Sequence, residues 1–250
     1  MKTAFVTGAS SGIGRATAVA LARAGFQLVV TGRRRERLDA LAAELAPVPV
    51  HVLVFDVRDR DATVAAVIGL PLEFAAVDVL VNNAGGAHGL NPIQTGDPTD
   101  WDAMLDANVR GLLNVTHALL PGLTARQTGF IVNIGSVAGR EAYANGNVYC
   151  ASKAAVGMLT KTMRLDLLPL GIRVAEIDPG AVETEFSEVR FKGDAERAAK
   201  VYEGFQPLKA EDIADVIAFM VTRPAHVNVA DVLILPAAQG AAATIFRQPA

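Results

Sequence analysis

The sequence predicts one α/β domain organised around a parallel sheet with helices on both faces. Three observations predict it: a length of 250 residues, short apolar runs that alternate with helical patterns, and a glycine-rich turn directly after the first run. Parallel strands need a crossover connection, usually a helix, so this alternation is typical of a doubly wound sheet. We find no internal repeat and no change in composition, and we therefore expect a single domain over residues 1–250.

The composition excludes several classes of protein. Hydrophobic residues make up 51% of the chain, mean hydropathy is +0.31, and the net charge is -3 with acids and bases mixed. This balance favours neither nucleic acid nor an anionic membrane surface as a partner. No apolar run reaches the roughly 18 residues of a membrane span, and we predict a cytoplasmic protein. Cys150 is the only cysteine and the histidines lack ligand spacing, so neither a disulfide nor a metal site is expected.

Residue patterns predict the position of each element. Apolar, β-rich runs predict strands at 3–7, 27–31, 50–55, 77–81, 130–134, 173–177 and 229–235. Helical patterns predict helices at 15–24, 59–75, 99–125, 147–168 and 209–222. Residues 181–208 are polar, charged and irregular, and a loop of that length is usually a functional lid or a disordered segment.

The turn after the first strand reads Gly8-Ala9-Ser10-Ser11-Gly12-Ile13-Gly14. It lies in a strand–turn–helix–strand unit of about 30 residues, which is the context of a dinucleotide-binding turn. Glycines let the backbone approach a pyrophosphate, and the start of the helix supplies N–H donors and a positive dipole end. The Ser10 and Ser11 hydroxyls could add hydrogen bonds to a phosphate. A glycine cluster alone is often only a tight turn, but this context favours cofactor binding.

The residues after the second strand indicate which dinucleotide binds. An NAD site usually has Asp or Glu here, which binds the ribose 2′-hydroxyl. This chain has Gly32-Arg33-Arg34-Arg35 and no acid before Glu36. A guanidinium can bind a 2′-phosphate in bidentate fashion, so we interpret Arg33, assisted by Arg34, as the selector for NADP. The alternative is a solvated, basic start of the next helix.

Polar groups near other strand ends are further candidates. Asp56 follows the third strand, within reach of an adenine amino group, and a surface acid is the alternative. Asn82-Asn83-Ala84-Gly85-Gly86 forms a turn after the fourth strand, on the cofactor side of the sheet. Ser136 lies directly after the fifth strand.

Asn108 is an amide on an apolar helix face. The stripe on that face consists of Trp101, Leu105, Asn108, Leu112, Val115 and Leu119. A buried amide must be hydrogen-bonded, or it costs a few kcal/mol. A water molecule that satisfies it structurally is the alternative to a functional role.

Tyr149 and Lys153 are four residues apart in a predicted helix and therefore lie on one face. A free tyrosine has a pKa of about 10, which is too high for proton exchange at neutral pH. A nearby ammonium lowers the pKa of a phenol toward the range that a general acid or base needs. An isolated pair of this spacing is usually a buried Tyr beside an exposed Lys, so the accompanying motifs decide the interpretation.

Together these motifs resemble the short-chain dehydrogenase/reductase family over the whole chain. They occur in its order and spacing as Thr7-Gly8-x-x-x-Gly12-x-Gly14, Asn82-Asn83-Ala84-Gly85, Asn108, Ser136, Tyr149-x-x-x-Lys153 and Pro179-Gly180. Residues 31–38, 146–149, 184–194 and 224–228 resemble a narrower branch, the NADP-dependent 3-hydroxy acid (serine) dehydrogenases. The resemblance implies a Rossmann fold with strand order 3-2-1-4-5-6-7 and a lid after strand 6.

The resemblance also implies the roles of single residues. Tyr149 would be the acid/base and Ser136 would hold the reacting oxygen. Lys153 would lower the Tyr149 pKa and hold the nicotinamide ribose, and Asn108 would anchor a water that relays protons. The implied cofactor contacts are Gly8, Ser10, Ser11, Gly12, Ile13, Gly14, Arg33, Arg34, Asp56, Val57, Asn83, Ala84, Gly85, Tyr149, Lys153, Pro179, Gly180, Val182 and Thr184.

The expected substrate is a small 3-hydroxy acid such as L-serine, L-allo-threonine or 3-hydroxypropionate. Its carboxylate needs a cation, for which Arg190 is the first candidate and Lys192 the second, with a solvated lid charge as the alternative. Glu141 and Glu185 could favour an amino group. A reductase of uncharged aldehydes or ketones is the runner-up, and a catalytically silent NADP-binding module is the third hypothesis. Apolar helices at 99–125 and 147–170, which the family pairs across a dimer, suggest a homotetramer.

Overall fold

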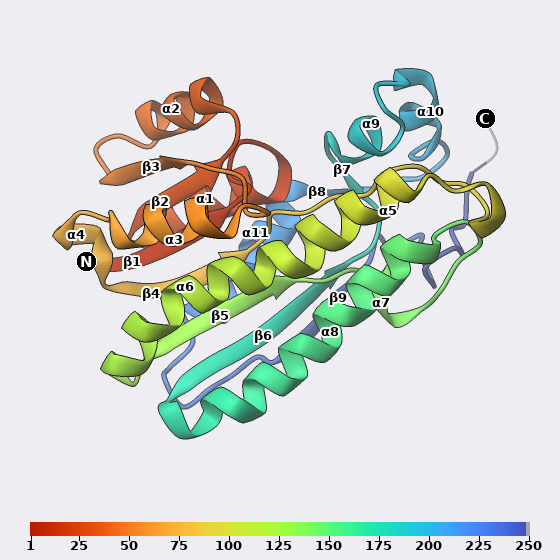
Figure 1. Cartoon of the computed structure of the whole chain (residues 1–250). Coiled ribbons are helices and arrows are strands. Elements are labelled where there is room, and N and C mark those ends of the chain that lie inside the picture. Colours follow the sequence, from red (N-terminus) through yellow and green to blue (C-terminus); the bar gives the residue numbers. More distant parts are fainter. Residues whose placement is uncertain (249–250) are drawn as a thin grey trace.

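A computed structural model of the chain, which describes residues 1–248, contains a seven-stranded parallel sheet (Figure 1). The strands are β1 (Lys2–Thr7), β2 (Phe26–Gly32), β3 (Val50–Val54), β4 (Val77–Asn82), β5 (Gly129–Ile134), β6 (Ile172–Pro179) and β9 (Asp231–Ile234). Their order in space is β3-β2-β1-β4-β5-β6-β9. The predicted fold and strand order are confirmed, with β9 as the seventh strand of the sheet.

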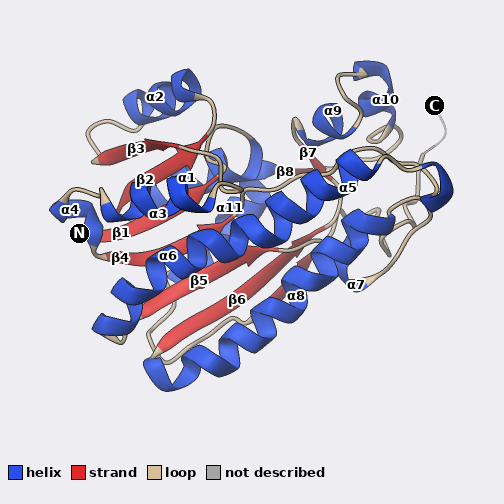
Figure 2. Ribbon diagram, viewed as in Figure 1, coloured by secondary structure: helices blue, strands red, loops and turns tan. Residues whose placement is uncertain are grey.

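Helices cover both faces of the sheet (Figure 2). One face packs against α1 (Gly12–Arg23), α2 (Arg35–Glu44) and α11 (Ala210–Val221). The other packs against α3 (Arg60–Ile68), α6 (Gly111–Arg126) and α8 (Asn147–Leu167). Because both faces are covered, successive residues of the central strands are buried, rather than every second one. Within residues 1–248, no helix is long and apolar enough to cross a membrane.

The predicted helix at 59–75 is two helices, α3 and the short α4 (Leu72–Ala75). Gly69 closes α3: its N–H donates to the Ala65 carbonyl at 2.9 Å, and the Leu70 N–H donates to the Val67 carbonyl at 3.3 Å. Pro71 then acts as the cap of α4. Proline lacks an N–H and disfavours helical backbone at the residue before it, so the chain breaks here.

The predicted helix at 99–125 is interrupted at Asn108. It consists of α5 (Pro98–Leu105), a π turn η2 (Asp106–Arg110) and α6. A π turn inserts one residue into the helical register. The predicted apolar stripe therefore fails before the turn, where Met104 is buried and Leu105 is 40% exposed. After the turn, the stripe is buried as predicted at Leu112, Val115 and Leu119.

The lid is not irregular, contrary to the prediction. It contains β7 (Val182–Glu183), α9 (Phe186–Arg190), α10 (Ala195–Lys200) and β8 (Leu208–Lys209), and the two short strands pair in parallel. The Asp194 carboxylate caps α10 by accepting from the Arg197 N–H at 3.0 Å. Tyr202 ties the segment together, because its hydroxyl donates to the Val182 carbonyl at 2.9 Å. The sequence pattern does not reveal these elements, because each is too short to show a periodic arrangement of apolar residues.

The lid is anchored to the body of the protein at two places. Glu185 forms ion pairs with Arg34, at 2.8 Å, and with Arg37. Further along, Lys192 pairs with Asp100 at 3.0 Å and lies 3.7 Å from Asp97. The segment after β6 is therefore held in a docked position over the carboxyl edge of the sheet.

We expect Glu185→Gln to loosen this docking and to raise the rate of proteolytic cleavage within residues 181–208 about two- to fivefold. Exposed ion pairs contribute about 0–1 kcal/mol, and cleavage follows the population of the open lid. The measurement is limited proteolysis with mass-spectrometric mapping. Glu188→Gln is the matched control, because Glu188 is an exposed lid glutamate with no ion pair in the described part of the chain. Equal cleavage of Glu185→Gln and wild type would contradict the anchoring role.

Candidate active site

The carboxyl ends of four neighbouring strands bring the predicted site residues to one edge of the sheet. β1 ends at the glycine turn, β4 at Asn82, β5 at Ile134, two residues before Ser136, and β6 at Pro179. All four strands are parallel and adjacent, so their ends meet. The Tyr149 and Lys153 side chains reach this edge from the first turns of α8.

The glycine turn is locked against the turn after β4. Thr7 Oγ1 accepts from the backbone N–H groups of Asn83 and Ala84, both at 2.9 Å. The Asn83 side chain donates to the Thr7 carbonyl at 2.9 Å. Gly8 has a φ of +67°, and a side chain there would also overlap Asn83 Nδ2. The turn therefore requires glycine at this position.

The start of α1 fits a dinucleotide. Its first residue, Gly12, has a φ of +51°, and the preceding Ser11 makes no side-chain cap hydrogen bond. The first N–H groups of a helix lack intrahelical partners and attract anions. A methyl group on Gly12 would meet Thr184 Cγ2 at 3.3 Å, so the lid lies directly against this turn. Ser10, Ser11 and Thr184 line one pocket.

Arg34 lies beside the two serines. Its guanidinium donates to Ser10 Oγ at 3.1 Å and to Ser11 Oγ at 2.7 Å, while Nη1 donates to Glu185. Arg33 is largely exposed and lies 3.9 Å from Asp56. The guanidinium groups of Arg33 and Arg34 supply the positive charge that a 2′-phosphate requires.

Asp56 is held by arginine. The Arg58 guanidinium donates to its carboxylate at 2.6 Å and lowers the pKa of Asp56. An acid bound in this way is negatively charged at neutral pH, which keeps it an acceptor for an amino group. Its predicted position at the edge of the sheet agrees with the structure, although its present partner is Arg58.

Asn108 is buried at the π turn, and its amide is satisfied by protein groups rather than by a water molecule. Oδ1 accepts from the Gly86 N–H at 2.8 Å, and Nδ2 donates to the Gly86 carbonyl at 2.9 Å. Nδ2 also donates to Ser152 Oγ at 2.9 Å, which links the π turn to α8. The sequence did not single out Ser152. The signal that could have found it is a hydroxyl between Tyr149 and Lys153 on the buried side of α8.

Tyr149 and Ser136 are both 8% exposed. Burial raises the pKa of the Tyr149 phenol well above its ordinary value, while a hydrogen bond with Ser136 and the charge of Arg190 act to lower it. That Lys153 lowers the Tyr149 pKa stays a prediction. In this structure the Lys153 ammonium donates to the Ile134 carbonyl at 2.8 Å.

Lys153 is itself buried, with 8% exposure. Burial lowers the pKa of Lys153 to about 8, and the carboxylates of Asp178 and Glu176 act to raise it. Asp178 Oδ1 also accepts from the Ser136 N–H at 2.8 Å. These two acids were not among the predicted site residues, although their spacing of two in a strand places both side chains on one face.

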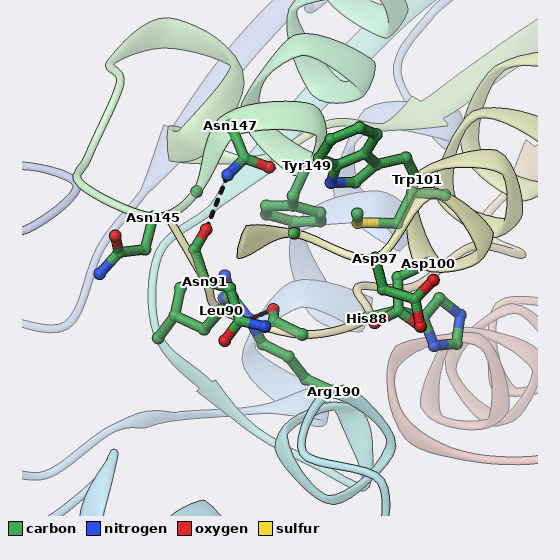
Figure 3. Close-up of a pocket in the computed structure, with 14 residues that line it drawn as sticks. His88, Leu90, Asn91, Asp97, Asp100, Trp101, Asn145, Asn147, Tyr149 and Arg190 are labelled. Carbon is green, nitrogen blue, oxygen red and sulfur yellow. Dashed lines mark hydrogen bonds between the residues drawn. The ribbon is translucent and has the colours of Figure 1, made fainter. Parts of the chain in front are cut away.

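Arg190 reaches from the lid into a pocket that Tyr149 also lines (Figure 3). Its guanidinium carbon lies 5.5 Å from the centre of the Tyr149 ring and 5.6 Å from that of Tyr143. Nε donates to the Gly89 carbonyl at 3.1 Å. Nη2 is buried and has no hydrogen-bond partner among residues 1–248, so it is available to an anion.

The other predicted substrate contacts are engaged elsewhere. Lys192, the second candidate, forms an ion pair with Asp100 at 3.0 Å. Glu185 binds Arg34 and Arg37, and Glu141 accepts from the Ala242 N–H at 2.9 Å. Their carboxylates are therefore poorly placed to select an amino group beside Tyr149. Cys150 is buried and lies close to Gly146.

Comparisons with known proteins identify the family of this chain. A family model described as short chain dehydrogenase matches residues 2–195. The chain is 48% identical to the sulfoacetaldehyde reductase of Chromohalobacter salexigens over 94% of each chain. It is 43% identical to the NADP-dependent 3-hydroxy acid dehydrogenase of Schizosaccharomyces pombe, over 100% of this chain and 98% of that one.

A solved structure has nearly the same backbone. The closed form of a serine dehydrogenase complexed with NADP+ matches with a TM-score of 0.94 and 41% identity, covering 98% of this chain and 100% of that chain. The family model, the identities and the arrangement at the carboxyl edge of the sheet agree. This chain belongs to the short-chain dehydrogenase family.

Proposed function

We propose that this protein is an NADP-dependent oxidoreductase that interconverts the alcohol of small 3-hydroxy acids and the corresponding carbonyl. The candidate substrates are L-serine, L-allo-threonine and 3-hydroxypropionate, or malonic semialdehyde in the reductive direction. The observation that carries the proposal is the buried Nη2 of Arg190, which lacks a partner in the described chain and belongs to a guanidinium 5.5 Å from the Tyr149 ring.

In the proposed chemistry, Tyr149 exchanges the proton and Arg190 binds the anionic group of the substrate. Tyr149 takes the proton from the alcohol oxygen during oxidation and returns it during reduction. Ser136 holds the same oxygen by a hydrogen bond and stabilises the charge that develops on it. When bound, the nicotinamide accepts hydride from the carbinol carbon or gives it to the carbonyl carbon. Arg190 binds the carboxylate and fixes which carbon faces the reacting groups.

Lys153 and Asn108 support these groups. The Lys153 ammonium holds the nicotinamide ribose. When Lys153 and Tyr149 both contact the bound cofactor, the ammonium charge favours the phenolate of Tyr149. Asn108 sets the position of α8 through Ser152, and we assign to its π turn the water that relays protons from Lys153. Both roles explain why polar groups are buried at this edge of an apolar core.

The chain's own residues provide a place for each part of NADP. The turn from Gly8 to Gly14 and the start of α1 hold the pyrophosphate. Arg33, Arg34 and the two serines hold the 2′-phosphate. Asp56 and Val57 hold the adenine, and 83–85, 179–182 and Thr184 line the nicotinamide side. A named relative that is NADP-dependent and a structural neighbour complexed with NADP+ support this assignment.

A second candidate substrate carries a sulfonate in place of the carboxylate. The relative named sulfoacetaldehyde reductase is 48% identical. Sulfoacetaldehyde and malonic semialdehyde both have an anionic group one methylene from the aldehyde, and a guanidinium binds either anion. Reduction of uncharged aldehydes or ketones is less well supported, because it leaves Nη2 of Arg190 buried without a partner.

We also propose that the protein is a cytoplasmic homotetramer. α8 exposes Met158 and Leu165, at 61% and 71%, and Leu168 follows at 70%. Large apolar side chains in a row on one helix favour burial against another copy. This face lies on the side of α8 away from the sheet.

The first prediction concerns the anion site. Arg190→Ala should lower kcat/KM for L-serine, 3-hydroxypropionate and sulfoacetaldehyde at least about 30-fold, since losing a buried charge partner costs at least about 2 kcal/mol. The dissociation constant for NADP should not change. Arg197→Ala, in the exposed lid helix α10, is the matched control. Turnover confined to uncharged alcohols or carbonyls, and insensitive to Arg190→Ala, would overturn the substrate class.

The second prediction concerns the cofactor. Arg33→Ala and Arg34→Ala should each lower the preference for NADP over NAD about 10-fold or more, because a hydrogen bond to a charged group contributes about 1.5–3 kcal/mol. Steady-state kinetics with both cofactors measures the ratio. Arg35→Ala is the control, because Arg35 pairs with Asp39 on α2 at 2.8 Å. An unchanged ratio in both variants would refute the assignment of the selector.

The third prediction concerns assembly. Size-exclusion chromatography with light scattering should give the mass of four chains for the wild type and a smaller species for Met158→Glu. A buried, unpaired charge at an interface is strongly unfavourable. Leu72→Glu is the control, because Leu72 is 93% exposed on the distant α4. A monomeric wild type would contradict the proposal.

A further inference from the structure

Two buried carboxylates lie behind the candidate catalytic lysine. Glu176 and Asp178 are two residues apart in β6, so their side chains leave the same face of the sheet, toward α8. Their exposures are 4% and 2%. Neither acid has a part in the proton and hydride chemistry proposed above.

Two glycines make the space that these acids occupy. A methyl group on Gly135, at the end of β5, would overlap both Asp178 Oδ1 and Glu176 Oε1, so these two oxygens are close neighbours. A methyl group on Gly157 would lie 3.3 and 3.4 Å from the two Glu176 oxygens. Gly157 is one helical turn beyond Lys153, so the Glu176 carboxylate lies against the helix that carries the lysine.

The charged groups around the pair are few. Asp178 Oδ2 accepts from Arg140 Nε, in α7 (Val137–Arg140), at 2.6 Å. Arg140 also pairs with Asp231 of β9, the strand neighbour of Glu176. Lys153 faces the pair from α8. With one proton shared by Glu176 and Asp178, these two acids together with Asp231 carry two negative charges. These balance the positive charges of Arg140 and Lys153.

Neighbouring carboxylates in a dry site cannot both ionise readily, because each disfavours the charge of the other. Both Asp178 oxygens already accept hydrogen bonds, one from the Ser136 N–H and the other from Arg140 Nε. Burial and the Asp178 charge raise the pKa of Glu176 to about 7. Glu176 is thus the member that holds the proton.

We propose that Glu176 and Asp178 share one proton and act together as the counter-charge of Lys153, so that ionisation of Glu176 keeps the lysine ammonium charged in alkaline solution. Glu176 is a positioning residue, since it acts through Lys153 and does not touch the reacting atoms. The proposal rests on the proposed function, in which the charge of Lys153 is required for turnover.

The sign of the effect follows from the charges. Below about pH 7, Glu176 is protonated and neutral. Above that pH it ionises, adds a negative charge behind Lys153 and raises the pKa of the ammonium. Glu176→Gln is permanently neutral and imitates the low-pH form at every pH.

The experiment compares pH profiles of kcat for wild type and Glu176→Gln with NADP and the best hydroxy acid. We expect rates within about twofold of each other at pH 6, and an alkaline limb that moves about one pH unit lower in the variant. Glu73→Gln, on exposed α4, is the matched control and should keep the wild-type profile. A fall that is equal at all pH values, or a shift in both variants, would overturn the proposal.

Infrared difference spectroscopy tests the shared proton without any turnover. The wild type at pH 6 should show a protonated-carboxyl C=O band that is absent from Glu176→Gln and that disappears as the pH rises through about 7. Absence of this band difference would overturn the shared proton. If the wild type turns over none of the substrates, the proposed function fails, while the infrared result still decides whether the pair holds a proton.

Discussion

The site depends on the contact between Thr7 at the end of β1 and the turn after β4. Thr7 Oγ1 accepts two N–H groups of that turn, and Asn83 donates back to the Thr7 carbonyl. This contact fixes the glycine turn at the position where α1 begins. It also fixes Gly86, whose backbone holds the buried amide of Asn108. One hydroxyl thus links the candidate cofactor turn with the π turn that supports α8.

Charge burial is the second constraint at this edge. Lys153, Asp178 and Glu176 are all buried. Buried charges are tolerated when they are paired and hydrogen-bonded. Here Asp178 accepts from the Ser136 N–H and from Arg140, while Lys153 donates to the Ile134 carbonyl. Asp178 and Lys153 thus bond to backbone groups at the end of β5, where a parallel sheet leaves such groups free.

The sequence predicted the sheet well because its signals are local: apolar runs, alternation with helices and a glycine turn. It predicted less about helix continuity, since the π turn at Asn108 shifts the apolar face by one residue without a change in composition. It missed Glu176 and Asp178 because an acid inside an apolar strand has no periodic signature. These two acids act to raise the pKa of Lys153, although they lie on β6, more than 20 residues further along the chain. Pairings over such distances require the fold.

In the proposed function, Arg190 would couple the charge of the substrate to the position of the lid. Its backbone carbonyl accepts from the Gly89 N–H at 2.9 Å, and its Nε donates to the Gly89 carbonyl at 3.1 Å. The guanidinium therefore reaches Tyr149 only while the lid is docked on the segment around Gly89. An anionic ligand that binds Nη2 has a higher affinity for the protein with a docked lid than for the protein with an open lid. Its binding therefore favours the docked state. An uncharged substrate gives no such contribution, so discrimination would arise from lid closure as well as from direct contact.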